Sequence, residues 1–116
     1  MPQFDFKAAR ETMVESQIRT ADVTDLDLLA AFRRVPRERF VPSSKMALAY
    51  GDSVVKYDDG RTMLRPRDLA KLIQAADIQP DEVVLDIASA RGYSTAILAR
   101  VAETVVGLET DDDAVD

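Results

Sequence analysis

Residues 83–109 hold a predicted strand, a tight loop, a helix and a second strand, and this unit constrains the fold more than any other segment. The apolar run from Val83 to Leu85 is typical of a parallel strand that is buried on both faces. Apolar residues at helical spacing follow, and either Gly92 or Ser94 can begin that helix. Such a unit crosses over right-handed in nearly all proteins, so both strands end at one edge of the sheet. The sequence therefore predicts an α/β fold with a ligand site at that edge.

An acidic residue stands near the end of each predicted strand. Glu109, at the tip of the second strand, can accept hydrogen bonds from both hydroxyls of a ribose. The loop after Asp86 lacks the glycine patterns that hold phosphates. We therefore expect an adenosine cofactor without phosphates, which S-adenosylmethionine fits. The alternative is an ordinary α/β unit in which Asp86 and Glu109 are only solvated or cap helices.

The chain of 116 residues contains no His and no Cys, which excludes several classes of chemistry. Ser-His-Asp hydrolases, Cys-His enzymes and zinc deaminases are excluded, and no metal site is expected. Methylation of a carboxylate is compatible with this composition, because that nucleophile is already ionised near neutral pH. A formal net charge of -6 argues against binding to nucleic acid. No apolar run predicts a membrane span or secretory signal, and we expect a cytoplasmic protein.

Residues 85–95, Leu-Asp-Ile-Ala-Ser-Ala-Arg-Gly-Tyr-Ser-Thr, resemble the cofactor motif of the protein-L-isoaspartate O-methyltransferase family, Leu-Asp-Ile/Val-Gly-x-Gly-x-Gly-Tyr. Residues 13–19, 35–42 and 49–50 are similar to the amino-terminal portion of that family. The resemblance implies a partial Rossmann-like S-adenosylmethionine methyltransferase fold with an amino-terminal helical and hairpin extension. It also implies methyl transfer to the carboxylate of isoaspartyl residues in protein or peptide substrates, a repair reaction.

By this resemblance, residues 1–80 form the extension and residues 81–116 form the first β-α-β of the cofactor domain, cut short. The implied active-site segment includes Thr62 and Leu64, with no catalytic residue assigned. Most residues implied in cofactor binding lie in or beside the loop, and Glu109 is the acid expected to hold the ribose. The full set is Asp86, Ala88, Ser89, Ala90, Gly92, Tyr93, Ser94 and Glu109.

The loop departs from the family pattern at three positions. Ala88 and Ala90 replace glycines, and a left-handed backbone there would cost about 1–2 kcal/mol for a residue with a Cβ. Arg91 stands where the family has a small residue, and it either pairs with the cofactor's carboxylate or repels its sulfonium and fills the pocket. Leu64 replaces a residue with a hydroxyl and can donate no hydrogen bond. These departures support a second hypothesis, a non-catalytic binding or assembly module derived from the same fold.

Only two strands of the family's larger sheet are encoded, and the first would present an open apolar edge. We expect a chain that is inactive alone, and that is either truncated or part of a homo-oligomer in which a second copy completes the sheet. Such a chain, made by itself, should be oligomeric, prone to aggregation or partly unordered.

The amino-terminal portion has patterns of short helices and one hairpin. We expect an amphipathic helix over residues 6–19, a second helix that begins with a capping box of Thr24 and Asp27, and a hairpin around Gly60. Pro66 is suited to begin a further helix. Four arginines alternate with Glu38 and are expected to form a solvated face: Arg33, Arg34, Arg37 and Arg39.

Overall fold

The computed structural model describes residues 5–57, 60–87 and 92–108. Its first helix, α1 (Phe6–Met13), continues through a π-helical turn, η1 (Val14–Ile18), into a short 3₁₀ turn, η2 (Arg19–Ala21). The side chain of Asp5 begins α1 by accepting a 3.0 Å hydrogen bond from the amide of Ala8. This continuous helical segment confirms the helix expected over residues 6–19, and its apolar side faces the core.

Three helical segments follow. Helix α2 (Leu26–Arg34) begins at Asp25, whose carboxylate accepts hydrogen bonds from the amides of Asp27 and Leu28. The capping box expected to begin at Thr24 was therefore wrong by one residue, because Asp25 supplies the acceptor. Two 3₁₀ segments, η3 (Arg37–Phe40) and η4 (Ser43–Leu48), then lead to the hairpin.

The expected hairpin and the helix after it are both present. Strands β1 (Val55–Lys56) and β2 (Thr62–Met63) pair antiparallel, with Val55 opposite Met63. Gly60 has a φ of 89°, a conformation that glycine adopts without cost. Helix α3 (Pro66–Ala76) has Pro66 in its first turn, as predicted.

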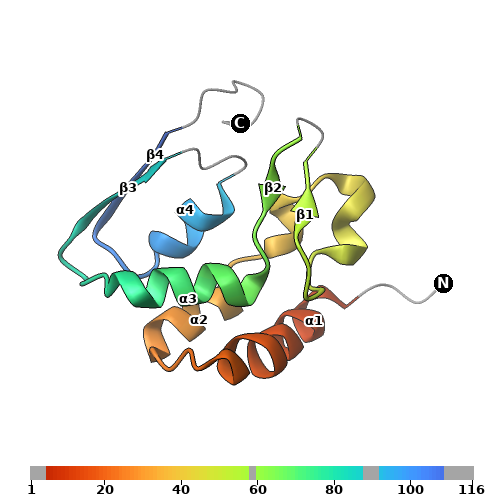
Figure 1. Ribbon diagram of the computed structural model, residues 1–116, viewed down its shortest axis with the longest axis horizontal. Coiled ribbons are helices and arrows are strands. Elements are labelled where there is room, and N and C mark those ends of the chain that lie inside the picture. The colour runs from red at the N-terminus through yellow and green to blue at the C-terminus, as the bar shows by residue number, and fades with distance from the viewer. Residues whose placement is uncertain (1–4, 58–59, 88–91, 109–116) are drawn as a thin grey trace.

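The β-α-β unit closes the described chain. Strand β3 (Val83–Ile87), helix α4 (Tyr93–Leu98) and strand β4 (Thr104–Leu108) follow one another, and the two strands pair in parallel from Val83↔Thr104 to Ile87↔Leu108. Both strands end at the same edge, as the crossover rule requires. Figure 1 shows α4 lying between the β3–β4 pair and the rest of the fold. The predicted partial Rossmann-like fold with an amino-terminal helical and hairpin extension is confirmed.

One cluster of buried apolar residues joins the two portions of the chain. It runs from Met13 in α1 through Phe32 in α2 to Ile97 in α4, each no more than 1% exposed. The core therefore contains residues from both sides of position 80. The boundary expected there between an extension and a cofactor domain stays a prediction. None of the helices in the described ranges has both the length and the hydropathy of a membrane span.

Strand β3 is not buried on both faces, contrary to the expectation from its continuous apolar run. Val83, Leu85 and Ile87 are 70%, 54% and 71% exposed, whereas Val84 between them is half-buried and packs against the core. The cause is the architecture: α4 covers one face of the two-stranded sheet, and no described element covers the other. An apolar run thus indicates that a strand is suited to cover on both faces, but it does not show that both faces are covered in this chain.

Candidate functional site at the end of strand β3

A pocket of about 300 Å³ lies between the hairpin, α3 and the carboxyl end of β3. Its volume is at the lower end of the range for small-molecule sites, and its lining is mostly apolar with a few polar groups. The lining residues come from four elements and the residues beside them: Tyr57, Thr62, Met63, Leu64, Leu69, Leu72, Asp86, Ile87, Tyr93 and Ser94.

The pocket brings together two sets of residues that the sequence assigned separately. Thr62 and Leu64, at the implied active-site segment, lie on the hairpin side. Three of the implied cofactor residues, Asp86, Tyr93 and Ser94, lie on the side of β3 and α4. More than 20 residues of sequence separate these sets, so only the fold makes them neighbours.

Only one of the remaining implied cofactor residues is described, and it does not line the pocket. Gly92 is described and precedes α4. The other four lie outside the described residues, as does Arg91: Ala88, Ser89, Ala90 and Glu109. Leu108, the residue before Glu109 in the sequence, is the register partner of Ile87 at the end of the parallel pair.

Asp86 ties the end of β3 to the first turn of α4. Its Oδ2 accepts a 2.6 Å hydrogen bond from Ser94 Oγ and a 2.8 Å hydrogen bond from Thr95 Oγ1. Both donors lie in the first turn of α4, where a negative charge is also favoured by the helix dipole. These two bonds therefore connect the two ends of the loop between β3 and α4 through one carboxylate oxygen.

Gly92 has the backbone conformation for which glycine is required. Its φ is 90°, and the 2.9 Å bond from the Ala96 amide to its carbonyl starts α4. A Cβ built on Gly92 would meet no atom within 4 Å, so conformation and not space selects glycine at this position. Gly92, rather than Ser94, is the residue that begins the helix.

Tyr93 forms a buried wall of the pocket. Its side chain is 2% exposed and packs against the rings of Phe32 and Phe40, with centroids 6.3 and 5.6 Å away. Burial raises the pKa of the Tyr93 phenol far above its usual range, and the neighbouring Arg37 lowers it only in part. The phenol therefore stays protonated near neutral pH and offers no general base.

Arg37 and Glu38 were expected on a solvated face, and this expectation is wrong. Arg37 is 0% exposed and Glu38 is 7% exposed, whereas Arg34 and Arg39 of the same segment are exposed. The alternation of charges gave no sign of burial, because the polar partners of Arg37 and Glu38 lie far from them in the sequence. The only sequence signal for this burial is that residues 35–42 form part of the family resemblance.

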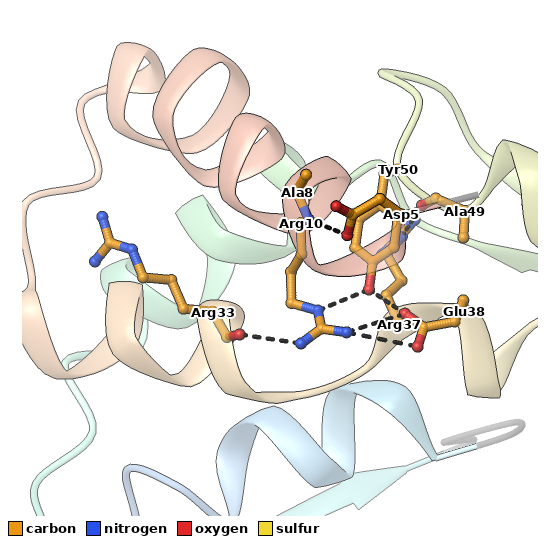
Figure 2. Close-up of polar contacts among 8 residues, drawn as sticks. All are labelled: Asp5, Ala8, Arg10, Arg33, Arg37, Glu38, Ala49 and Tyr50. Atoms are coloured by element: carbon orange, nitrogen blue, oxygen red, sulfur yellow. Dashed lines mark hydrogen bonds and ion pairs between the residues drawn. The ribbon is translucent and has the colours of Figure 1, made fainter. Parts of the chain in front are cut away.

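Glu38 belongs to a buried polar cluster with Arg10 and Tyr50, which Figure 2 shows beneath α1. Arg10 Nε donates a 2.9 Å hydrogen bond to Tyr50 Oη, and Arg10 Nη2 lies 3.3 Å from Glu38 Oε1. The Tyr50 hydroxyl donates to the same oxygen of Glu38. This cluster joins α1, η3 and the turn that follows η4, and none of its members lines the pocket.

The donor set of the pocket suits an organic ligand better than a metal ion. Among the described residues, no three carboxylates gather where they could hold a metal ion. Thr62, Asp86 and Ser94 place hydroxyl and carboxylate groups among apolar side chains, the usual composition of a cofactor or substrate site. The residues present therefore fit a ligand that carries both an apolar and a polar part.

Comparison with protein families identifies the same relatives as the motifs. Residues 8–115 match the family model described as protein-L-isoaspartate(D-aspartate) O-methyltransferase. A protein-L-isoaspartate O-methyltransferase from Opitutus terrae is 41% identical over 100 residues, 86% of this chain and 43% of that protein. A protein-L-isoaspartate O-methyltransferase 1 from Rhodopseudomonas palustris is 41% identical over 104 residues, 90% of this chain and 42% of that protein. The chain thus spans less than half the length of these curated relatives.

Solved structures agree with the fold. A protein-L-isoaspartate O-methyltransferase superposes with a TM-score of 0.79 and 28% identity, over 90% of this chain and 35% of the other. A Plasmodium falciparum protein described as a β-aspartate methyltransferase, in complex with S-adenosyl-L-homocysteine, has a TM-score of 0.69 and 22% identity. The match covers 97% of this chain and 52% of the Plasmodium falciparum chain. At this sequence identity, it supports the fold alone. The methyltransferases of the matched family use S-adenosylmethionine. By the match over residues 8–115, this chain belongs to the protein-L-isoaspartate O-methyltransferase family.

Proposed function

We propose that this chain binds S-adenosylmethionine at the end of β3 and serves methyl transfer to the carboxylate of isoaspartyl residues in proteins or peptides. The observation that carries the proposal is the shared pocket: Thr62 and Leu64 line it from the hairpin, and Asp86 lines it from β3. Membership of the family supports the reaction. Binding of the cofactor and transfer of the methyl group are separable parts of the proposal.

The cofactor would supply an electrophilic methyl group bound to a sulfonium. In the transfer, the carbon–sulfur bond breaks, a carbon–oxygen bond to the acceptor forms, and sulfur keeps the electron pair. The acceptor carboxylate is ionised near neutral pH, so no group of the chain has to remove a proton. The residues of the pocket have to align the reactants and exclude water. Apolar residues such as Leu64, Leu69 and Ile87 are suited to excluding water.

Each implied cofactor residue keeps its role as part of this proposal. Asp86 would support the loop, and Tyr93 and Ser94 would stand beside the methionine part at the start of α4. The loop residues Ala88, Ser89, Ala90 and Gly92 would line that part, and Glu109 would hold the ribose. The bonds from Ser94 and Thr95 to Asp86 support the first assignment, because they join both flanks of the loop.

Calorimetric titration of S-adenosylmethionine into the chain tests the first part. The matched variants are Ala88→Gly with Ala90→Gly, which restores the family pattern, and Ser53→Gly, which adds glycine to an exposed segment elsewhere. Binding by the unmodified chain supports the proposal, and tighter binding by the double variant alone would show that the two methyl groups obstruct the site. An absence of heat from all three would favour the alternative, a non-catalytic binding or assembly module.

Transfer of a labelled methyl group tests the second part. The acceptor is an isoaspartyl peptide, and the control is the same peptide with an ordinary aspartyl residue. Labelling of both peptides alike would contradict the assignment of isoaspartyl carboxylates as the acceptor. Binding without labelling of either peptide would leave the chain a cofactor-binding unit.

Self-association and cellular location of the chain are also proposed. We propose self-association through the uncovered face of the β3–β4 pair, whose apolar side chains are exposed: Val83, Leu85, Ile87, Val106 and Leu108. A second copy of the chain would cover that face or add to the sheet. The proposed location is the cytoplasm, with which a composition free of Cys is compatible.

A further inference from the structure

Arg37 is a buried cation that contacts residues on both sides of the pocket. Its Nε donates a 2.5 Å hydrogen bond to the carbonyl of Ala49, and its Nη2 donates a 2.9 Å hydrogen bond to the carbonyl of Leu64. Figure 2 shows Arg37 and Ala49 next to the polar cluster of Arg10 and Tyr50. Leu64 immediately follows β2 and lines the pocket, so one end of the guanidinium holds the hairpin side of the site.

The guanidinium also contacts the opposite side of the pocket. Its Cζ lies 4.9 Å from the centroid of the Tyr93 ring, within the range of a cation–π contact. Tyr93 is the first residue of α4 and lines the pocket from that side. Arg37 thus touches both walls, although it does not line the pocket itself.

The electrostatic surroundings of Arg37 are unusual for a core residue. Glu38, its neighbour in sequence, pairs with Arg10 instead. Among the described residues, no carboxylate forms an ion pair with Arg37, and its Nη1 has no hydrogen-bond partner. Burying a cation on two carbonyls and a ring is costly, and an apolar residue would fill the same space at less cost. Packing alone therefore gives a poor account of an arginine at this position.

We propose that Arg37 is a positioning residue, which fixes the Leu64 side of the pocket relative to the Tyr93 side and so sets the width of the binding site. The planar fork of the guanidinium suits this role, because it directs two donors at fixed angles while its face stacks on a ring. A lysine keeps the charge but has no fork. This inference rests on the proposed function only in that it takes the pocket as the binding site.

The test compares Arg37→Lys with Arg10→Lys. Arg10 is also largely buried, but its partners are Tyr50, Glu38 and the carbonyl of Arg33, none of which lines the pocket. Both variants are studied in trimethylamine N-oxide, which favours compact states, so that a destabilised chain still folds. The first measurement is the calorimetric affinity for S-adenosyl-L-homocysteine. We expect Arg37→Lys to weaken binding at least about tenfold, because small displacements of aligned groups are costly. Arg10→Lys should bind as the unmodified chain does.

The second measurement needs no ligand. Met63 lies in β2 and lines the pocket, and it is one of four methionines in the chain. With ¹³C-methyl methionine, we expect the Met63 signal to shift in Arg37→Lys and to keep its position in Arg10→Lys. Met63→Leu assigns the signal. If the unmodified chain binds no S-adenosyl-L-homocysteine, the proposed cofactor site fails while this measurement still tests Arg37.

Three results would overturn the positioning role of Arg37. One is an unmoved Met63 signal in Arg37→Lys. Another is equal affinity of Arg37→Lys and Arg10→Lys for S-adenosyl-L-homocysteine, given that the unmodified chain binds it. The third is an Arg37→Lys chain that stays unfolded in the osmolyte while Arg10→Lys folds, because Arg37 would then serve the core as a whole.

Discussion

Ser94 Oγ donates a 2.6 Å hydrogen bond to Asp86 Oδ2, which joins the first turn of α4 to the end of β3 across the loop between them. Thr95 Oγ1 donates to the same oxygen at 2.8 Å. A β-α-β unit fixes its loop through the elements on either side, and here one carboxylate oxygen connects both. The shape of the pocket at this edge therefore depends on Asp86, whether or not its carboxylate contacts a ligand.

The first prediction concerns Asp86→Asn. The amide keeps one oxygen but loses the negative charge, and hydrogen bonds to a charged group contribute about 1.5–3 kcal/mol. We expect the free energy of unfolding, measured in urea, to fall by about 1–2 kcal/mol. The control is Asp81→Asn at an exposed position before β3, which should leave it within about 0.5 kcal/mol. Equal effects of the two substitutions would show that the bonds from Ser94 and Thr95 contribute nothing particular.

The second prediction compares two glycines. Gly92→Ala places a Cβ on a residue with a φ of 90°, where it meets no neighbouring atom, so the whole cost is conformational and should be about 1–2 kcal/mol. Gly51 does not have a positive φ, and a Cβ there would meet Leu48 O at 3.5 Å, an ordinary contact. Gly51→Ala should therefore be neutral or slightly stabilising in the same urea titration. A cost at Gly51 that matches the cost at Gly92 would contradict this account.

The β-α-β unit could be predicted from the sequence because its signals are local. The strand pattern around Leu85 and the helix that Gly92 can begin both follow from short-range rules. The hairpin around Gly60 and the helix after Pro66 follow from the same kind of rule. The identities of Thr62 and Leu64 as pocket residues came from the resemblance, and only the packing of the hairpin beside β3 makes them neighbours of Asp86.

The burial of Arg37 and Glu38 could not be predicted, because charge patterns carry no information about long-range partners. Glu38 is stabilised by Arg10, which lies 28 residues earlier, and Arg37 by carbonyls at residues 49 and 64. The prediction that Leu85 would be buried was wrong for a related reason. A run of apolar residues indicates that a strand can be covered on both sides, but its actual cover depends on elements elsewhere in the sheet.

The third prediction concerns acid. Burial raises the pKa of Glu38, but hydrogen bonds from Tyr50, from its own backbone amide and from Arg10 outweigh burial, so the pKa lies below its usual value of 4.5. A pKa lower in the folded than in the unfolded chain adds stability above the unfolded value, and that stability is lost as the pH falls through the folded value. We expect the free energy of unfolding to decrease as the pH falls below about 4.5, and less steeply in Glu38→Gln. An unchanged slope in Glu38→Gln would refute this role of Glu38.

The fourth prediction concerns base. Burial, together with the hydrogen bond to Glu38, raises the pKa of Tyr50 to about 12, against a usual value of 10.0. Here the folded value is the higher one, so the stability is fully present below pH 10 and is lost as the pH rises toward about 12. Tyrosinate absorbance should show Tyr50 titrating above pH 11 in the folded chain, and Tyr50→Phe should remove that step. A Tyr50 step at pH 10 would mean that the phenol is not held by Glu38.

The fifth prediction uses two neighbours on opposite faces of β3. Leu85 is 54% exposed on the uncovered face, whereas Val84 is half-buried and packs against the core. Leu85→Lys should reduce the concentration dependence of sedimentation, because it places a charge on the face proposed for self-association. It should change the free energy of unfolding by less than about 0.5 kcal/mol, while Val84→Lys should lower it by about 1–3 kcal/mol. A compact monomer at every concentration of the unmodified chain would exclude self-association through this face, and the exposed apolar residues would then need another account.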